Sequence, residues 1–130
     1  MPTIASIQGV TNTTVLDYFK TLSNGEFQAT SNLFAIDGIL YPPFENPIEG
    51  KQAIAAYLET EAKGITLHPN QGSVQVVQHG QTQVEVLGKV EMPLFGVNVR
   101  WLMILNAQNR ITSVTIQLLA SPQELMQLQR

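Results

Sequence analysis

Apolar residues recur at helical spacing in three stretches of the first half of the chain. The first stretch begins at Asn12 or the threonine before it, both good helix caps, and ends before Gly25. A second helix is predicted over residues 26–34 and a third over residues 51–63, which two glycines bracket. A short strand is predicted over residues 39–41, because an Asp-Gly pair precedes it and prolines follow it.

From residue 65 the pattern changes to the alternation that is typical of β-strands. Strands are predicted around residues 74–77 and over residues 81–92, 99–105 and 111–119, with turn-forming residues between them. Ser-Pro-Gln-Glu at 121–124 is a capping box with proline at the first helical position, so a short C-terminal helix is expected. Helices followed by a meandering sheet indicate a single α+β domain over residues 1–130, with the helices packed on one face of a curved antiparallel sheet. Such a sheet can enclose a pocket.

The composition supplies more apolar surface than a small core needs. Charged residues make up 13% of the 130 residues and hydrophobic residues 44%, so part of the apolar surface is available for a ligand or a partner. The net charge of −3 and the scattered lysines and arginines argue against nucleic-acid binding. The chain has no cysteine, which excludes disulfides and thiolate metal sites, and we predict no metal site. No signal peptide or membrane span is apparent, so a cytoplasmic protein is expected.

Four stretches of the chain, in the same order, resemble the C-terminal domain of the cyanobacterial orange carotenoid protein and stand-alone homologues of that domain. They are GVTNTTVLDYF from Gly9, LFAIDGILYPPFENPIEGK from Leu33, LGKVEMPLFG from Leu87 and LLASPQEL from Leu118. The resemblance implies a nuclear transport factor 2-like cone, in which helices pack against a curved sheet. It covers nearly the whole chain.

The resemblance also implies a ligand, a keto-carotenoid of the canthaxanthin or echinenone type. In the family, a tyrosine on the first helix and a tryptophan on a central strand donate hydrogen bonds to the ring carbonyl, and the matching residues here are Tyr18 and Trp101. A buried ketone without donors costs about 1–3 kcal/mol, and neutral donors avoid the desolvation of Lys or Arg. The resemblance further places five apolar residues along the pocket: Leu22, Ile65, Leu67, Met103 and Ile116. It also places Leu94 at the pocket mouth, where relatives commonly have tryptophan. Taken without the resemblance, Tyr18 and Trp101 are more commonly ordinary core residues, and the five pocket residues are explained equally well as core.

The function that this resemblance implies is carotenoid binding and transfer, with a photoprotective role in quenching singlet oxygen. Glu61 matches a carboxylate that pairs with an arginine of the helical domain in two-domain relatives, so we expect exchange of pigment with a separate helical carotenoid protein. A forty-carbon polyene is long for a domain with a radius of gyration of about 14 Å. We therefore expect a noncovalent homodimer that shares one carotenoid, and transient membrane contact during pigment uptake. The C-terminal helix is a candidate to close the empty pocket.

Two other classes stay open, a cone-fold enzyme of the isomerase or dehydratase type and a pigment-free association domain. An enzyme needs an acid or base in the pocket, and the candidates are Asp17, Asp37, His68 and His79. Asp17 is predicted to face solvent, and the other three are predicted in turns or loops. We therefore predict no catalytic residue and no enzymatic activity.

Overall fold

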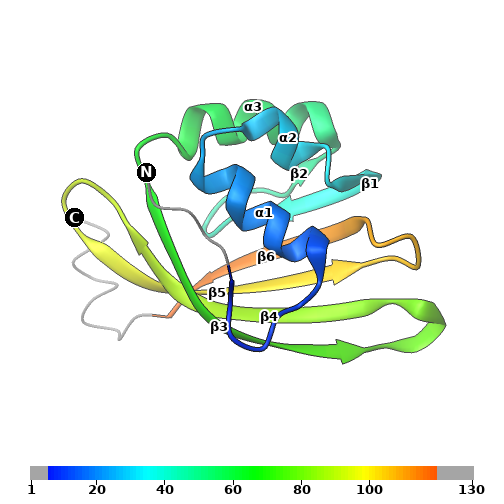
Figure 1. Cartoon of the computed structure of the whole chain (residues 1–130). Coiled ribbons are helices and arrows are strands. Elements are labelled where there is room, and N and C mark those ends of the chain that lie inside the picture. Colours follow the sequence, from blue (N-terminus) through cyan, green and yellow to red (C-terminus); the bar gives the residue numbers. More distant parts are fainter. Residues whose placement is uncertain (1–5, 120–130) are drawn as a thin grey trace.

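The helices lie over one face of a single curved sheet in the computed structural model, which describes residues 6–119 (Figure 1). The helical layer consists of α1 (Thr13–Ser23), α2 (Phe27–Ser31) and α3 (Lys51–Glu61). The sheet consists of β1 (Phe34–Tyr41), β2 (Ile48–Glu49), β3 (Thr66–Val76), β4 (Thr82–Glu91), β5 (Gly96–Leu105) and β6 (Ile111–Leu118), and a single 3₁₀ turn, η1 (Gln78–Gly80), joins β3 to β4. The strand order is β2-β1-β6-β5-β4-β3. The arrangement confirms the predicted α+β class, while the predicted C-terminal helix lies outside the described residues.

Helix α1 begins where its sequence predicts. The side chain of Asn12 accepts a hydrogen bond from the Val15 backbone N–H at 3.1 Å, which satisfies one of the free amides of the first turn. The Asn12 amide also donates to the Asn109 side chain at 2.8 Å, in the turn between β5 and β6. This cap therefore fixes both the start of α1 and its position against the sheet.

The sheet is mixed, which corrects the predicted antiparallel sheet. Strand β1 pairs parallel with β6, whereas β6, β5, β4 and β3 form an antiparallel series. The Ile111 N–H donates to the Leu33 carbonyl at 3.0 Å, at the entry to β1. This pairing also explains why α2 ends at Ser31 and why β1 already begins at Phe34, the last residue of the predicted helix.

Two smaller predictions are also corrected. His68 and Pro69 lie inside β3 rather than in a loop. Proline is tolerated there because β3 is at the edge of the sheet and its register with β4 shifts after Pro69, so the missing proline N–H costs little. Asp37 lies within β1, where the register with β6 shifts, rather than in a turn. Helix α3 ends two residues earlier than predicted, at Glu61.

The core lies between α1 and the inner face of the sheet. Along β5 every second side chain is buried, as expected for a strand with one face covered. Val15, Phe19 and Leu22 bring the apolar face of α1 against these side chains. No helix within residues 6–119 is long and apolar enough to cross a membrane.

Candidate ligand-binding site

An apolar cavity of about 140 Å³ lies between the helices and the inner face of the sheet. Its walls come from α1, α3, the end of β1, and β3 to β6. The lining residues are Tyr18, Leu22, Leu40, Pro43, Tyr57, Leu58, Glu61, Ala62, Ile65, Leu67, Val90, Met92, Val97, Val99, Trp101, Ile116 and Leu118. Glu61 is the one charged residue in this set, so the cavity suits a largely apolar ligand with few polar atoms.

Tyr18 and Trp101 line the same cavity, from α1 and β5 respectively. Tyr18 is 1% exposed and Trp101 is 2% exposed. The Tyr18 hydroxyl is buried and has no hydrogen-bond partner among the residues that the structure describes. Burial also raises the pKa of Tyr18, so the phenol stays protonated and keeps its donor. An unpaired buried hydroxyl is costly, and a ligand with an acceptor atom would satisfy it.

A second phenol in the cavity wall is already engaged. The Tyr57 hydroxyl donates to the Glu45 carboxylate at 2.7 Å, which ties α3 to the proline-rich connection after β1. The pKa of Tyr57 is raised by burial, by this hydrogen bond and by the negative charges of Glu45 and Glu61. The Tyr57 donor is therefore occupied, unlike that of Tyr18. Sequence reasoning missed this pair, because the two residues lie on different elements without a recognisable motif.

The other predicted site residues divide into two groups. Leu22, Ile65, Leu67 and Ile116 line the cavity beside Tyr18 and Trp101. Two others lie elsewhere in the fold: Met103 is fully buried among core residues, paired with Val84 and Val114, and Leu94 is 93% exposed between β4 and β5. Met103 follows Trp101 on the same face of β5 but lies one step farther along the strand, in the filled part of the core.

The four candidates for acid-base chemistry lie away from the cavity. Asp17, Asp37, His68 and His79 are exposed, and the cavity lining within residues 6–119 includes none of them. The His68 imidazole lies 3.6 Å from the Glu91 carboxylate on the sheet surface. The described part of the chain holds no group of three or more His, Cys, Asp or Glu side chains suited to a metal ion.

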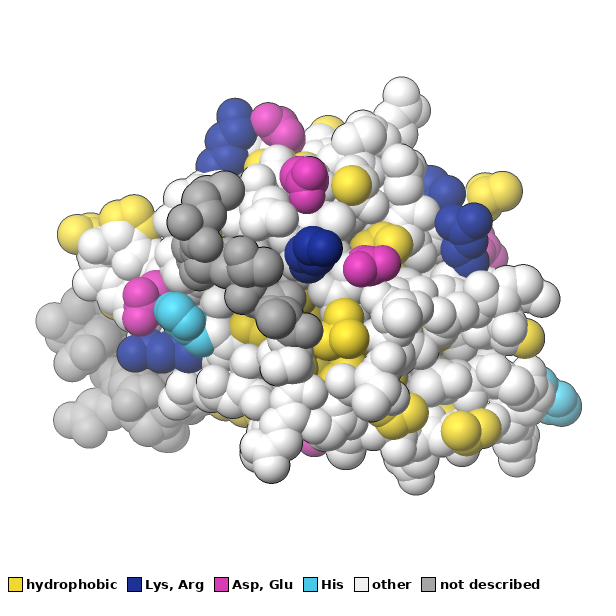
Figure 2. All heavy atoms as spheres, viewed as in Figure 1, with side chains coloured by type: hydrophobic (Ala, Val, Ile, Leu, Met, Phe, Trp, Pro, Cys, Tyr) yellow, Lys and Arg dark blue, Asp and Glu magenta, His cyan; other side chains and the backbone are white. Residues whose placement is uncertain are grey.

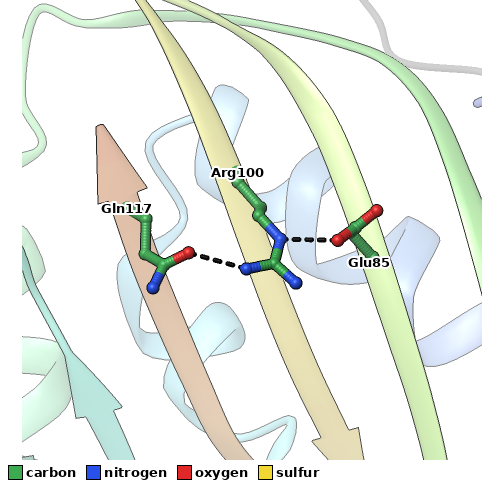
Figure 3. Close-up of polar contacts among 3 residues, drawn as sticks. All are labelled: Glu85, Arg100 and Gln117. Carbon is green, nitrogen blue, oxygen red and sulfur yellow. Dashed lines mark hydrogen bonds and ion pairs between the residues drawn. The ribbon is translucent and has the colours of Figure 1, made fainter. Parts of the chain in front are cut away.

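The outer face of the sheet carries a polar cluster across three strands (Figure 3). Arg100 on β5 donates through Nε to Glu85 on β4 at 2.5 Å and through Nη1 to Gln117 on β6 at 2.8 Å. Because side chains alternate along a strand, Arg100 points away from the cavity that its neighbour Trp101 lines. This cluster links the strands and is separate from the candidate site.

The family profile described as nuclear transport factor 2 (NTF2) domain matches residues 10–118. The chain belongs to the nuclear transport factor 2 domain family. The NTF2-like fold predicted from the sequence is thereby confirmed. The predicted resemblance to the orange carotenoid protein is confirmed by two similar proteins and by solved structures.

Two proteins named orange carotenoid-binding protein are similar to this NTF2 domain. The one from Synechocystis sp. is 41% identical over 98% of this chain, and the one from Limnospira maxima is 42% identical over 97%. The match covers 42% and 41% of those proteins, so the chain spans about two fifths of their length.

Solved structures agree with this similarity. The Anabaena (Nostoc) sp. PCC 7120 orange carotenoid protein binding canthaxanthin superposes with a TM-score of 0.85 at 42% identity, over 94% of this chain and 40% of that one. The Fremyella diplosiphon protein OCP1 gives a TM-score of 0.86 at 38% identity, over 98% of this chain and 40% of that one. The epoxide hydrolase/cyclase-like enzyme SalBIII matches at 18% identity with a TM-score of 0.63, over 82% of this chain and 88% of that one, which shows a common fold alone.

Proposed function

We propose that this domain binds a keto-carotenoid by one end ring, whose carbonyl accepts hydrogen bonds from Tyr18 and Trp101. The observation that carries the proposal is the buried Tyr18 hydroxyl, which lines an apolar cavity with Trp101 and finds no partner within residues 6–119. A carbonyl offers acceptors only, and both side chains are neutral donors. The similarity to orange carotenoid proteins, one of them described as binding canthaxanthin, supports the same ligand class.

The size of the cavity supports binding by one end of the ligand. An apolar protein cavity of about 150 Å³ accepts a benzene molecule, and the volume here is about 140 Å³. This space accommodates a six-membered ring but not a long polyene. The polyene would therefore leave the domain through the mouth of the cavity and need a second cover.

Exposed apolar residues follow cavity-lining residues at three places in the chain. Phe44 follows Pro43, Leu119 follows Leu118, and Leu94 and Phe95 come shortly after Met92. Figure 2 shows apolar side chains at several separate places on one face of the molecule, between charged side chains. The four exposed residues, here called the apolar rim, favour association with another apolar surface. This rim supports a homodimer that shares one carotenoid between two copies.

The finer role that we propose is carriage of the pigment and its transfer to or from a helical carotenoid protein, with quenching of singlet oxygen by the bound polyene. Glu61 lines the cavity and is exposed, which supports contact of its carboxylate with a basic side chain of a partner beside the mouth. The same apolar rim is suited to brief contact with a membrane during uptake. A surface ion pair contributes at most about 1 kcal/mol, so Glu61 would orient the partner more than bind it.

The central test is pigment binding by the purified domain. We expect the wild type to take up canthaxanthin, and Tyr18→Phe and Trp101→Phe each to weaken binding by about 5- to 150-fold, which corresponds to the loss of one hydrogen bond. Tyr41→Phe, at an exposed site outside the cavity lining, is the matched control. β-Carotene has no carbonyl and should bind the wild type and both variants equally. Unchanged canthaxanthin affinity and colour in the double variant would contradict the proposal.

The homodimer and the partner contact need separate measurements. We expect light scattering to show a dimer when canthaxanthin is bound, with one pigment per two chains. Glu61→Gln should slow transfer to a helical carotenoid protein while pigment affinity stays the same, and Glu59→Gln is the control on the same helix. A monomer carrying a whole pigment, or equal transfer rates in the two variants, would count against these assignments.

A further inference from the structure

Phe19 packs against both candidate donors without being one of the cavity-lining residues of the described chain. It is fully buried and follows Tyr18 in α1. Its ring centroid lies 5.1 Å from that of Tyr18 with an interplanar angle of 85°, and 4.9 Å from that of Trp101 with an angle of 86°. Both are edge-to-face contacts, a geometry that aromatic pairs prefer. One side chain thus connects the two donors.

Packing, not hydrogen bonding, fixes the direction of the Tyr18 ring. Its hydroxyl has no partner inside the range 6–119, so no polar contact there restrains it. Phe34 on β1 lies against Tyr18 with centroids 6.4 Å apart, in a tilted arrangement. Among the aromatic pairs of the described residues, Phe19 is the ring common to Tyr18 and Trp101.

We propose that Phe19 is a positioning residue that aims Tyr18 and Trp101 together at the carbonyl of the ligand. This inference rests on the proposed function. Donors that are already held in place lose little freedom on binding, and hydrogen bonds weaken steeply when their angle is poor. A tilt of either ring therefore lowers the preference for a ketone. It leaves the apolar contacts with the hydrocarbon part of the ligand nearly unchanged.

The selectivity between a ketone and a hydrocarbon separates positioning from simple packing. We expect Phe19→Leu to lower the ratio of canthaxanthin to β-carotene affinity by about tenfold, the change that follows from losing roughly one hydrogen bond. Phe27→Leu is the matched control, because Phe27 is buried in α2 and is not among the residues that line this cavity. A purely structural role would lower both affinities in parallel and would make the two variants alike. Such a result, or an unchanged ratio in Phe19→Leu, overturns the proposal.

A second measurement needs no pigment, because Trp101 is the single tryptophan of the chain. Time-resolved fluorescence anisotropy should show wider indole motion in Phe19→Leu than in the wild type or Phe27→Leu. If Phe19→Leu does not fold, Phe19→Met retains most of the volume and is measured instead. If the wild type binds neither carotenoid, the proposed function fails. The anisotropy still tests the role of Phe19 in that case. Wider indole motion of Trp101 in the Phe19 variant alone supports the positioning role, and unchanged indole motion overturns it.

Discussion

Removal of the Tyr18 hydroxyl should stabilise the domain when no ligand is bound. Tyr18→Phe keeps the ring and its packing and deletes an oxygen that is buried without a partner in residues 6–119. An unsatisfied buried hydroxyl costs about 1–3 kcal/mol, so the free energy of unfolding should rise by up to that amount. For a domain of this size, each kcal/mol raises Tm by roughly 3–5 °C. Urea and thermal unfolding of the pigment-free protein measure both quantities.

Two other tyrosines provide the comparison. Tyr57→Phe loses the 2.7 Å hydrogen bond to Glu45 and should lower the free energy of unfolding by about 0.5–1 kcal/mol, whereas Tyr41→Phe on the exposed side of β1 should change it little. With canthaxanthin bound, the sign for Tyr18→Phe should reverse, because the hydroxyl then has a partner. A pigment-free Tyr18→Phe protein that is less stable than the wild type would refute the reasoning, since the hydroxyl would then already be satisfied.

Three further results are expected. Burial raises the pKa of Tyr18, so the contribution of this group to the free energy of unfolding is fully present below about pH 10. This contribution falls as the pH rises further, by up to about 1.4 kcal/mol per pH unit. Urea unfolding above about pH 10 should show that the free energy of unfolding depends less on pH in Tyr18→Phe than in the wild type. Ile116→Phe places a ring in the cavity beside Trp101, its partner across β5 and β6, and should abolish pigment uptake in an absorbance assay while Tm changes little. Asn12→Ala removes the helix cap and the contact with Asn109, and should lower the free energy of unfolding by about 0.5–2 kcal/mol in urea.

Local patterns predicted α1 well, because everything that defines it is nearby in the chain. Asn12 supplies the cap, and the apolar spacing marks the buried face. The parallel pairing of β1 with β6 was not predictable in this way, since the two segments lie some seventy positions apart and nothing in either one encodes its partner. The same pairing shortened α2. Long-range contacts thus decided the elements that local propensity assigned wrongly.

In the candidate site, too, local patterns predict some features and long-range packing decides the others. Period-two alternation puts both Trp101 and Met103 on the inner face of β5, but it does not tell which one lines a cavity and which one fills the core. That depends on where the helices leave space above the sheet. Leu94 shows the limit of the resemblance as a guide, because the hairpin connection that carries it projects into solvent. The convergence of Tyr18 with Trp101 came from the family resemblance, not from spacing.

The two phenols of the cavity explain how a nearly apolar site could select one class of ligand. The Tyr57 hydroxyl already donates its hydrogen bond to Glu45, so Tyr57 presents little more than a ring to the cavity. Tyr18 keeps its donor free at a cost of about 1–3 kcal/mol, which a ligand with an acceptor recovers on binding. That recovery corresponds to a preference of about 5- to 150-fold for a ring ketone over the equivalent hydrocarbon. The unpaired hydroxyl is therefore a source of selectivity, because a domain with that group already satisfied would offer a ring ketone only the Trp101 donor and would discriminate less between the two carotenoids.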